Sequence, residues 1–206
     1  GEQDIFRSMQ LLPGVSGSNE SSSGLVVRGG TIDQNLVLFD DYTVYHVDHV
    51  FGFFSAFNNN AIKDVQFYKG GFGAKYGGRM SSVVDITGKD GNTEQFNIGG
   101  GASLLSTNTI IETPFADGAG SFILTGRKSY QSDFYNDILE SVTGENQNAQ
   151  AGISTPGQFA LGRFEIEPES YFYDLNAKLT YRLPNDDKFS ISFYNGADEL
   201  DNSRDV

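Results

Sequence analysis

The feature that most constrains the fold is a strict alternation of residue types in the last third of the chain. From Tyr171 to Leu183 every odd position is apolar or aromatic, and every even position except Phe172 is polar. A period of two is typical of a β-strand with one apolar and one polar face. After the turn-forming residues 184–187 the alternation resumes at Phe189, which predicts a second strand paired with the first.

Two kinds of β-structure fit this alternation. In a soluble antiparallel sheet the apolar face covers a core, whereas in an outer-membrane barrel the apolar face meets lipid and the polar face meets the lumen. The run is longer than the roughly 5 to 6 residues of ordinary strands and reaches the roughly 9 to 11 residues that cross a bilayer. Tyrosines near its ends suit the membrane interfaces, so we favour the barrel.

Weaker alternation earlier in the chain extends this pattern. We predict five barrel-type strands, at residues 94–105, 107–115, 120–128, 170–183 and 188–195. The connections 116–119 and 184–187 are short, whereas 129–170 is long, polar and rich in Gly and Asn. Short turns then fall on one side of the membrane and the long loop on the other, as in known barrels.

The first 91 residues have a different character, with short alternating helices and strands. Asp4 is expected to cap a short helix that has Ile5, Met9 and Leu12 on one face and stops at Pro13 and Gly14. Apolar runs predict strands at 25–27, 36–39, 62–67 and 82–87. The chain is therefore predicted to be α+β, with one unit over 1–91 and another over 92–206.

Three ordered blocks of the first unit resemble the plug domain of TonB-dependent receptors. Residues 25–30 (LVVRGG) and 35–41 (NLVLFDD) resemble its signature strands, and residues 4–15 resemble the helix that precedes them. Residues 61–70, 74–79 and 83–87 resemble the segment that closes the plug and leads into the barrel. Residues 77–86 (GGRMSSVVDI) are most similar to receptors from Bacteroidetes.

The resemblance implies a small mixed α/β plug domain followed by antiparallel strands of an incomplete outer-membrane β-barrel. It also implies energy-coupled uptake of a scarce extracellular ligand, such as a siderophore, a cobalamin, a glycan or a peptide. The implied partners are a periplasmic TonB protein, the ligand and the lipid of a Gram-negative outer membrane. The alternative, from another class, is a soluble β-rich binding or adhesion module.

The length of the chain indicates a fragment. A barrel of about 22 strands of roughly 10 residues exceeds 206 residues. Unpaired strands at the margins of an incomplete sheet would favour oligomerisation of the isolated fragment. We expect Gly1 to be a remnant of cloning or processing.

The resemblance also implies site residues. In the family a plug arginine and a second basic residue face barrel glutamates, and here these positions are Arg28 and Lys69. Lysine in place of the commoner arginine gives up bidentate pairing with a carboxylate. An aromatic cluster is expected to pack in the plug or against the barrel: Tyr42, Tyr45, Phe51, Phe53, Phe54 and Phe57. Four of its members are candidates for contact with the ligand: Tyr42, Tyr45, Phe53 and Phe54.

Other functions find little support in the sequence. A net charge of −13 with only 14 Lys and Arg argues against nucleic-acid binding. No apolar run has the length of about 18 residues that a membrane-spanning helix needs. No catalytic motif occurs, and residues 71–77 lack the spacing of a dinucleotide loop. We predict neither an enzyme nor a cofactor.

Two groups of possible metal ligands are predicted to have roles other than metal binding. His46 and His49 have no third histidine to complete a site, which predicts a packing or solvent-exposed role. Asp198, Asp201 and Asp205 lack the glycine and terminal glutamate of a calcium loop and are predicted to form a solvated acidic tail.

Overall fold

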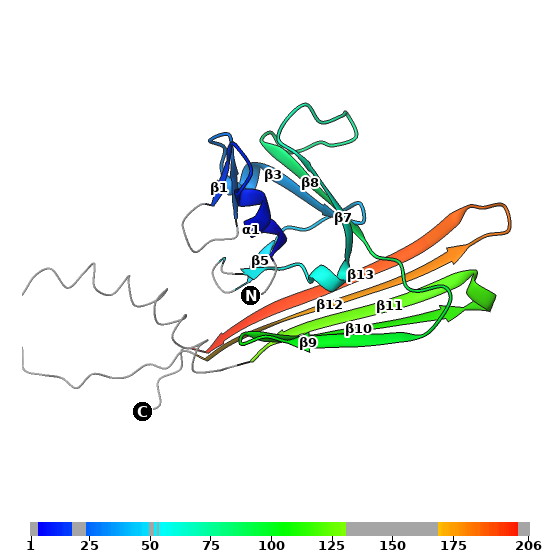
Figure 1. Cartoon of the computed structure of the whole chain (residues 1–206). Coiled ribbons are helices and arrows are strands. Elements are labelled where there is room, and N and C mark those ends of the chain that lie inside the picture. Colours follow the sequence, from blue (N-terminus) through cyan, green and yellow to red (C-terminus); the bar gives the residue numbers. More distant parts are fainter. Residues whose placement is uncertain (1–3, 18–23, 50–51, 53, 131–168, 202–206) are drawn as a thin grey trace, which may run out of the picture.

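The computed structural model describes residues 4–17, 24–49, 52, 54–130 and 169–201. Two parts lie one on the other (Figure 1). The N-terminal unit comprises the described residues between 4 and 88, and it sits on one face of a long five-stranded sheet.

The N-terminal unit begins with the predicted helix, α1 (Ile5–Gln10). The prediction was wrong for Leu12, which lies beyond the end of the helix and is exposed. Its cap, Asp4, accepts a hydrogen bond from the Arg7 backbone N–H at 3.1 Å and another from the Ser55 N–H at 2.7 Å. One aspartate therefore starts the helix and also fixes it to a strand 51 residues away in sequence. Beside the helix, β1 (Val15–Gly17) pairs antiparallel with β2 (Leu25–Val27).

A four-stranded mixed sheet forms the centre of this unit. Its order is β4 (Tyr42–Thr43), β3 (Asn35–Phe39), β8 (Ser82–Gly88) and β7 (Ile62–Tyr68). The central pair, β3 and β8, is parallel. β3 is a continuous apolar run from Leu36 to Phe39 because both of its faces are buried. β8 is buried at Val83, Val84 and Ile86, whereas Asp85 is half-buried and Thr87 is exposed. One face packs on α1 and Phe57, and the other packs on Tyr76.

Short elements complete the described chain. β5 (Asp48–His49) and β6 (Phe54–Ser55) form a small antiparallel pair. Single 3-10 turns lie at η1 (Ile32–Gln34), η2 (Asn59–Ala61) and η3 (Ala116–Gly118). The described part is thus mostly β, and the predicted α+β class rests on one six-residue helix. Within the described ranges, no helix has the length and apolarity needed to span a membrane.

The second part is an antiparallel sheet with the order β13, β12, β11, β10, β9. Its strands are β9 (Asn97–Ala102), β10 (Ser106–Phe115), β11 (Gly120–Ser129), β12 (Glu169–Arg182) and β13 (Lys188–Asp201). Each of the five predicted strands is present. The predicted end of the last one, at residue 195, was wrong, because β13 continues to Asp201 and its Asp198 contacts His46 and His49 of the N-terminal unit.

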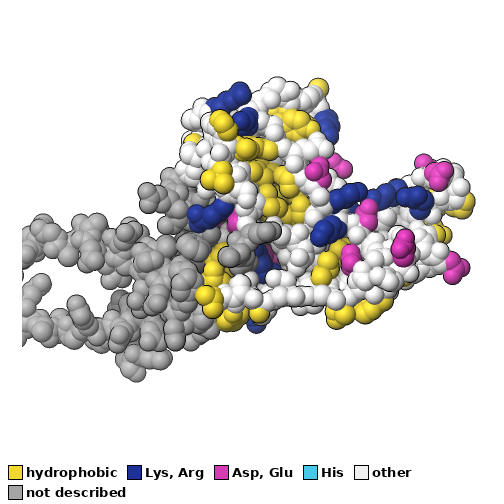
Figure 2. Space-filling view, in the orientation of Figure 1, with side chains coloured by type: hydrophobic (Ala, Val, Ile, Leu, Met, Phe, Trp, Pro, Cys, Tyr) yellow, Lys and Arg dark blue, Asp and Glu magenta, His cyan; other side chains and the backbone are white. Residues whose placement is uncertain are grey.

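The two faces of this sheet have opposite character. The face toward the N-terminal unit carries the polar set, whose buried members include Ser121, Thr125, Arg127, Asp174, Asn176, Lys178 and Thr180. The other face carries exposed apolar side chains: Tyr171, Tyr173, Leu175, Leu179, Phe189, Ile191 and Phe193. Apolar atoms show along the margin of the sheet farthest from the N-terminal unit (Figure 2). The alternation is therefore real, and its apolar side points outward.

The connection between the two parts passes very close to β11. A Cβ added at Gly91 would lie 2.4 Å from the carbonyl oxygen of Phe122 and 2.7 Å from its carbonyl carbon. Both atoms belong to backbone held in the sheet, so they cannot move aside cheaply. We expect Gly91→Ala to lower the free energy of unfolding by about 1–3 kcal/mol, measured by urea titration with circular dichroism.

Gly77→Ala is the matched control. Its added Cβ meets no atom within 4 Å, and the variant should stay within about 0.5 kcal/mol of the parent. Equal stability of the two variants would contradict the close crossing at Gly91.

Candidate functional site

The two predicted basic residues lie away from the five-stranded sheet. Arg28 is exposed at the end of β2, with a φ of 51°. Lys69 donates a hydrogen bond to the Pro13 carbonyl oxygen at 2.9 Å. Within the described residues neither forms an ion pair with this sheet. Their contact with barrel glutamates stays a prediction.

Two members of the predicted aromatic cluster pack in the interior. Phe57 is buried between Phe6 and Phe39, with ring centroids 5.5 and 6.1 Å away. Phe54 is buried against Phe172 of β12 at 5.2 Å. Phe172, the exception in the polar face of β12, is thus the apolar contact of that face with the N-terminal unit.

The remaining aromatic candidates differ in exposure. Tyr42 is half-buried beside Phe39, at 5.8 Å between ring centroids. Tyr45 is 83% exposed. Phe51 and Phe53 lie outside the described residues. Of the predicted ligand contacts that the structure describes, Tyr45 offers the most accessible ring, and the ligand role itself stays a prediction.

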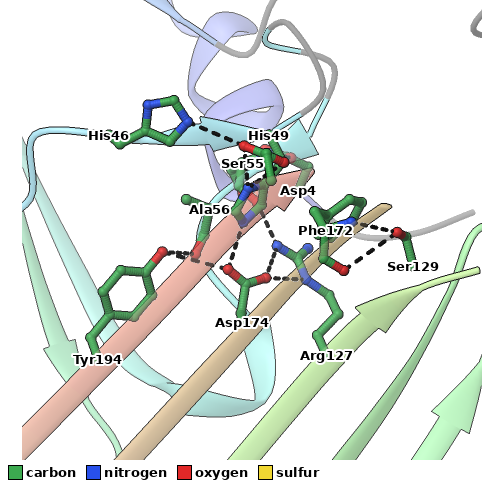
Figure 3. Close-up of polar contacts among 11 residues, drawn as sticks. Asp4, His46, His49, Ser55, Ala56, Arg127, Ser129, Phe172, Asp174 and Tyr194 are labelled. Carbon is green, nitrogen blue, oxygen red and sulfur yellow. Dashed lines mark hydrogen bonds and ion pairs between the residues drawn. The ribbon is translucent and has the colours of Figure 1, made fainter. Parts of the chain in front are cut away.

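One polar contact between the two parts is a group that we name the Asp174 cluster: His46, His49, Arg127, Asp174, Tyr194 and Asp198 (Figure 3 labels all but Asp198). Its centre is buried, and His46 and Asp198 lie at its exposed outer end. The Asp174 side chain is fully buried on β12. Arg127 Nε of β11 donates to Asp174 Oδ2 at 2.7 Å. His49 Nε2 of β5 lies 2.6 Å from Asp174 Oδ1. A cation of the sheet and an imidazole of the N-terminal unit therefore share one carboxylate.

Backbone carbonyls of the N-terminal unit complete the cluster. Arg127 Nη2 donates to the Ser55 carbonyl at 2.6 Å, and the Tyr194 hydroxyl donates to the Ala56 carbonyl at 2.9 Å. Phe172 stacks on the His49 ring at 4.6 Å and lies 5.1 Å from the Arg127 guanidinium. Since each buried polar group has partners, burial of these charges is tolerated.

His49 lies between two carboxylates. Its Nδ1 is 3.0 Å from Asp198, on the side opposite Asp174. Burial by itself would lower the pKa of His49, but hydrogen bonds and charge attraction from Asp174 and Asp198 outweigh burial and raise the pKa to about 9. At neutral pH the imidazole is therefore a cation, which together with Arg127 balances the two aspartates.

A second group, the Asp40 cluster, joins the two parts nearer the 184–187 turn; its members are Asp40, Asp90, Lys178, Thr180, Lys188 and Ser192. Lys178 Nζ donates to Asp40 Oδ1 at 3.0 Å and to the Gly88 carbonyl at 3.1 Å. Lys188 Nζ donates to Asp90 Oδ2 at 2.7 Å. Burial would raise the pKa of Asp90, but its hydrogen bonds to Lys188 and Thr180 and the charges of both lysines lower it.

Local backbone geometry places the Asp40 carboxylate. Asp40 and Asp41 connect β3 to β4 in a two-residue turn, and both have positive φ values, 44° and 69°. Aspartate tolerates this left-handed conformation better than most residues. The Asp40 side chain also accepts hydrogen bonds from the Gly88 N–H and from the Ser192 hydroxyl. The turn formed by Asp40 and Asp41 therefore contacts the five-stranded sheet through the Asp40 side chain.

Sequence reasoning missed both clusters, and one interpretation was wrong. Asp198 is not part of a solvated tail, because it lies in β13 and faces His46 and His49. Asp201 is the last residue of β13, and Asp205 lies outside the described residues. The available signal was the placement of Asp174 and Lys178 at inward positions of a strand. The pattern indicated that both charges need partners of opposite charge, but it did not indicate which residues supply them.

Comparison with known proteins agrees with this geometry. Residues 1–84 match the TonB-dependent Receptor Plug Domain family. The matched residues that the structure describes fall within its N-terminal unit. No curated protein matches the chain.

The whole chain also resembles a solved structure, a mutant of the ferric enterobactin receptor of Pseudomonas aeruginosa in complex with enterobactin. The TM-score is 0.53 at 16% sequence identity, which shows a shared fold. The likeness covers 96% of this chain but 31% of that receptor, so the chain spans about a third of its length. The matched family and this structure are both receptors, and neither is an enzyme.

Removal of the central carboxylate tests the Asp174 cluster. Asp174→Asn keeps the size of the side chain but leaves two buried cations facing a neutral amide. We expect the free energy of unfolding to fall by about 3–5 kcal/mol as the N-terminal unit loses its hold on the sheet, measured by urea unfolding with limited proteolysis. Lys188→Ala, which removes a half-exposed ion pair of the same interface, should cost about 0.2–1 kcal/mol. Similar losses in the two variants would contradict a buried, interdependent cluster.

The raised pKa of His49 predicts a pH dependence. Because the folded-state pKa is raised from 6.5 to about 9, the stabilisation is complete below pH 6.5 and is lost as pH rises through 9. The contribution of the His49 pKa shift to the free energy of unfolding is on the order of 3 kcal/mol. Unfolding temperatures in metal-free buffer from pH 6 to 10 should therefore fall more steeply for the parent than for His49→Gln, which does not titrate. Parallel curves would show that His49 stays neutral.

Proposed function

We propose that this chain is part of a TonB-dependent outer-membrane receptor, with a plug over residues 1–91 and wall strands of a β-barrel over 92–206. The observation that carries the proposal is the orientation of the five-stranded sheet. Its polar face is buried beneath the plug, while its apolar face is exposed. This is the reverse of a soluble sheet and the arrangement of a barrel wall around its contents.

Strand length and connections support the same proposal. β12 and β13 each have 14 residues, more than the roughly 9 to 11 that a tilted strand needs to cross a bilayer. Tyr171, Tyr173 and Tyr181 lie near the ends of β12, with Leu175 and Leu179 between them. This distribution matches an apolar band flanked by aromatic girdles. The short connections 116–119 and 183–187 lie at the same end of the sheet (Figure 1).

The proposed activity is the admission of a scarce extracellular ligand when a periplasmic TonB protein displaces part of the plug. This uptake needs no covalent chemistry in the chain. It needs a plug held at defined positions by contacts that can be broken, and the two polar clusters supply such contacts. The solved neighbour holds enterobactin, a siderophore, and the ligand class here stays open among siderophores, cobalamins, glycans and peptides.

The remaining predictions belong to this proposal. Arg28 and Lys69 would face barrel glutamates. Among the proposed ligand contacts Tyr42, Tyr45, Phe53 and Phe54, the exposed ring of Tyr45 is best placed for that role, whereas Phe54 is buried. Residues 77–86 support an origin in Bacteroidetes. β9 and β13 form the margins of the described sheet, and the chain expressed by itself would associate through these strands.

A soluble binding module would require the opposite arrangement. Its apolar face would have to be covered within the folded chain, and Leu175, Leu179, Phe189 and Ile191 are instead exposed. The structure therefore favours the receptor over this alternative.

The same substitution at two depths tests the lipid contact. Leu179 and Leu183 are outward-facing and similarly exposed, at 37% and 41%, but Leu183 lies beyond Tyr181 at the edge of the predicted apolar band. The two are about 13 Å apart along the strand. In a bilayer Leu179→Arg should cost about 2–4 kcal/mol and Leu183→Arg about 0–1 kcal/mol.

The measurement is the stability and yield of the full-length protein in outer-membrane fractions and in lipid vesicles. A clear loss for Leu179→Arg with near-parental behaviour of Leu183→Arg supports the proposal. Equal tolerance of both arginines, or a protein that is stable and monodisperse without detergent, would contradict it.

A further inference from the structure

Three potential metal ligands converge at the outer end of the Asp174 cluster. His46 and His49 come from the plug, and Asp198 comes from β13 (Figure 3 shows the two histidines). One ligand atom from each lies within 4.8 Å of the other two. His46 Nε2 is 3.3 Å from Asp198 Oδ2, and His49 Nδ1 is 3.0 Å from the same oxygen.

These separations are close to those around a bound zinc ion. Zinc binds histidine nitrogen and carboxylate oxygen at about 2.0–2.2 Å in tetrahedral geometry, which places neighbouring ligand atoms about 3.3–3.5 Å apart. Both nitrogen-to-oxygen distances already fall near this range. Bringing all three ligand atoms within bonding distance of one ion requires movement mainly of His46, whose side chain is 73% exposed and can change rotamer.

The surrounding groups favour metal binding by His49. Metal-bound histidines usually donate the other ring N–H to a carboxylate, which fixes the tautomer and the ring orientation. Asp174 lies 2.6 Å from His49 Nε2, so Nδ1 is the nitrogen directed toward Asp198. Phe172 stacks on the same ring at 4.6 Å and restricts its rotation.

The ligand set also selects the kind of ion. Two imidazoles and one carboxylate suit zinc and its transition-metal neighbours, whereas calcium and magnesium prefer an all-oxygen set. Exposure of His46 leaves room for water to complete the coordination. The chain has two histidines, and the third ligand is a carboxylate 149 residues beyond His49.

We propose that His46, His49 and Asp198 form a zinc site that links the plug to β13. The ion would replace the proton that otherwise bridges His49 and Asp198, and it would join the two parts more firmly than a hydrogen bond. The site needs only these contacts, whether or not the complete protein is a transporter.

The test is zinc binding to the full-length protein, stripped with EDTA and titrated with zinc against a chromophoric chelator. The parent should bind one zinc ion with high affinity. His46→Ala and Asp198→Asn should each weaken the affinity at least about tenfold, because even residues that only support a ligand change affinity by about 10- to 100-fold. Asp64→Asn, which removes an exposed carboxylate on β7, is the matched control and should change affinity less than twofold.

A second readout separates the site from nonspecific binding to an acidic protein. Saturating zinc should raise the unfolding temperature of the parent and of Asp64→Asn, but not that of His46→Ala. His46 is exposed, so its replacement should not prevent folding. Absence of zinc binding by the parent, or parental affinity in His46→Ala and Asp198→Asn, would overturn the proposal.

Discussion

The structure depends on an electrostatic constraint at the inward face of the five-stranded sheet. Asp174 and Lys178 are buried there, and a buried charge is stable only when groups of opposite charge and hydrogen-bond partners surround it. Arg127 supplies part of this from the sheet, but His49 and Asp40 must come from the plug. The position of the plug is therefore dictated by the charges that it neutralises.

The two clusters also set the register of the plug on the sheet. Asp174 and Lys178 are four residues apart on β12, about 13 Å along the strand. On the sheet, Asp174 supplies an anion and Lys178 supplies a cation. On the plug, His49 faces Asp174 and Asp40 faces Lys178, so the two pairs of charges are complementary. A shift of the plug by four residues along β12 would bring like charges together, which costs several kcal/mol. Buried ion pairs add little net stability, and here their complementary order fixes where the N-terminal unit lies on the sheet.

Much of the fold could be predicted because it follows from local patterns. Alternation from Tyr171 to Leu183 predicted a long strand, and Asp4 before an apolar face predicted the helix. The pattern left lipid and core as alternatives, since periodicity does not reveal which face is covered. The polar clusters depend on contacts between Asp198 and His49, and between Lys178 and Asp40, more than 130 residues apart in sequence. Such pairings are fixed by tertiary packing, so the strand end and the role of Asp198 could not be predicted.

The most direct test of the account is a measurement of which face of β12 meets lipid. The chain has no cysteine, so spin labels can be attached to single cysteines introduced at Ala177, Leu179 and Tyr181, and at Asn176 and Thr180. In lipid vesicles, collision with dissolved oxygen should be high at the three odd positions and low at the two even ones. Equal oxygen accessibility at all five positions, or maxima at the even ones, would contradict an apolar face in lipid and a polar face beneath the plug.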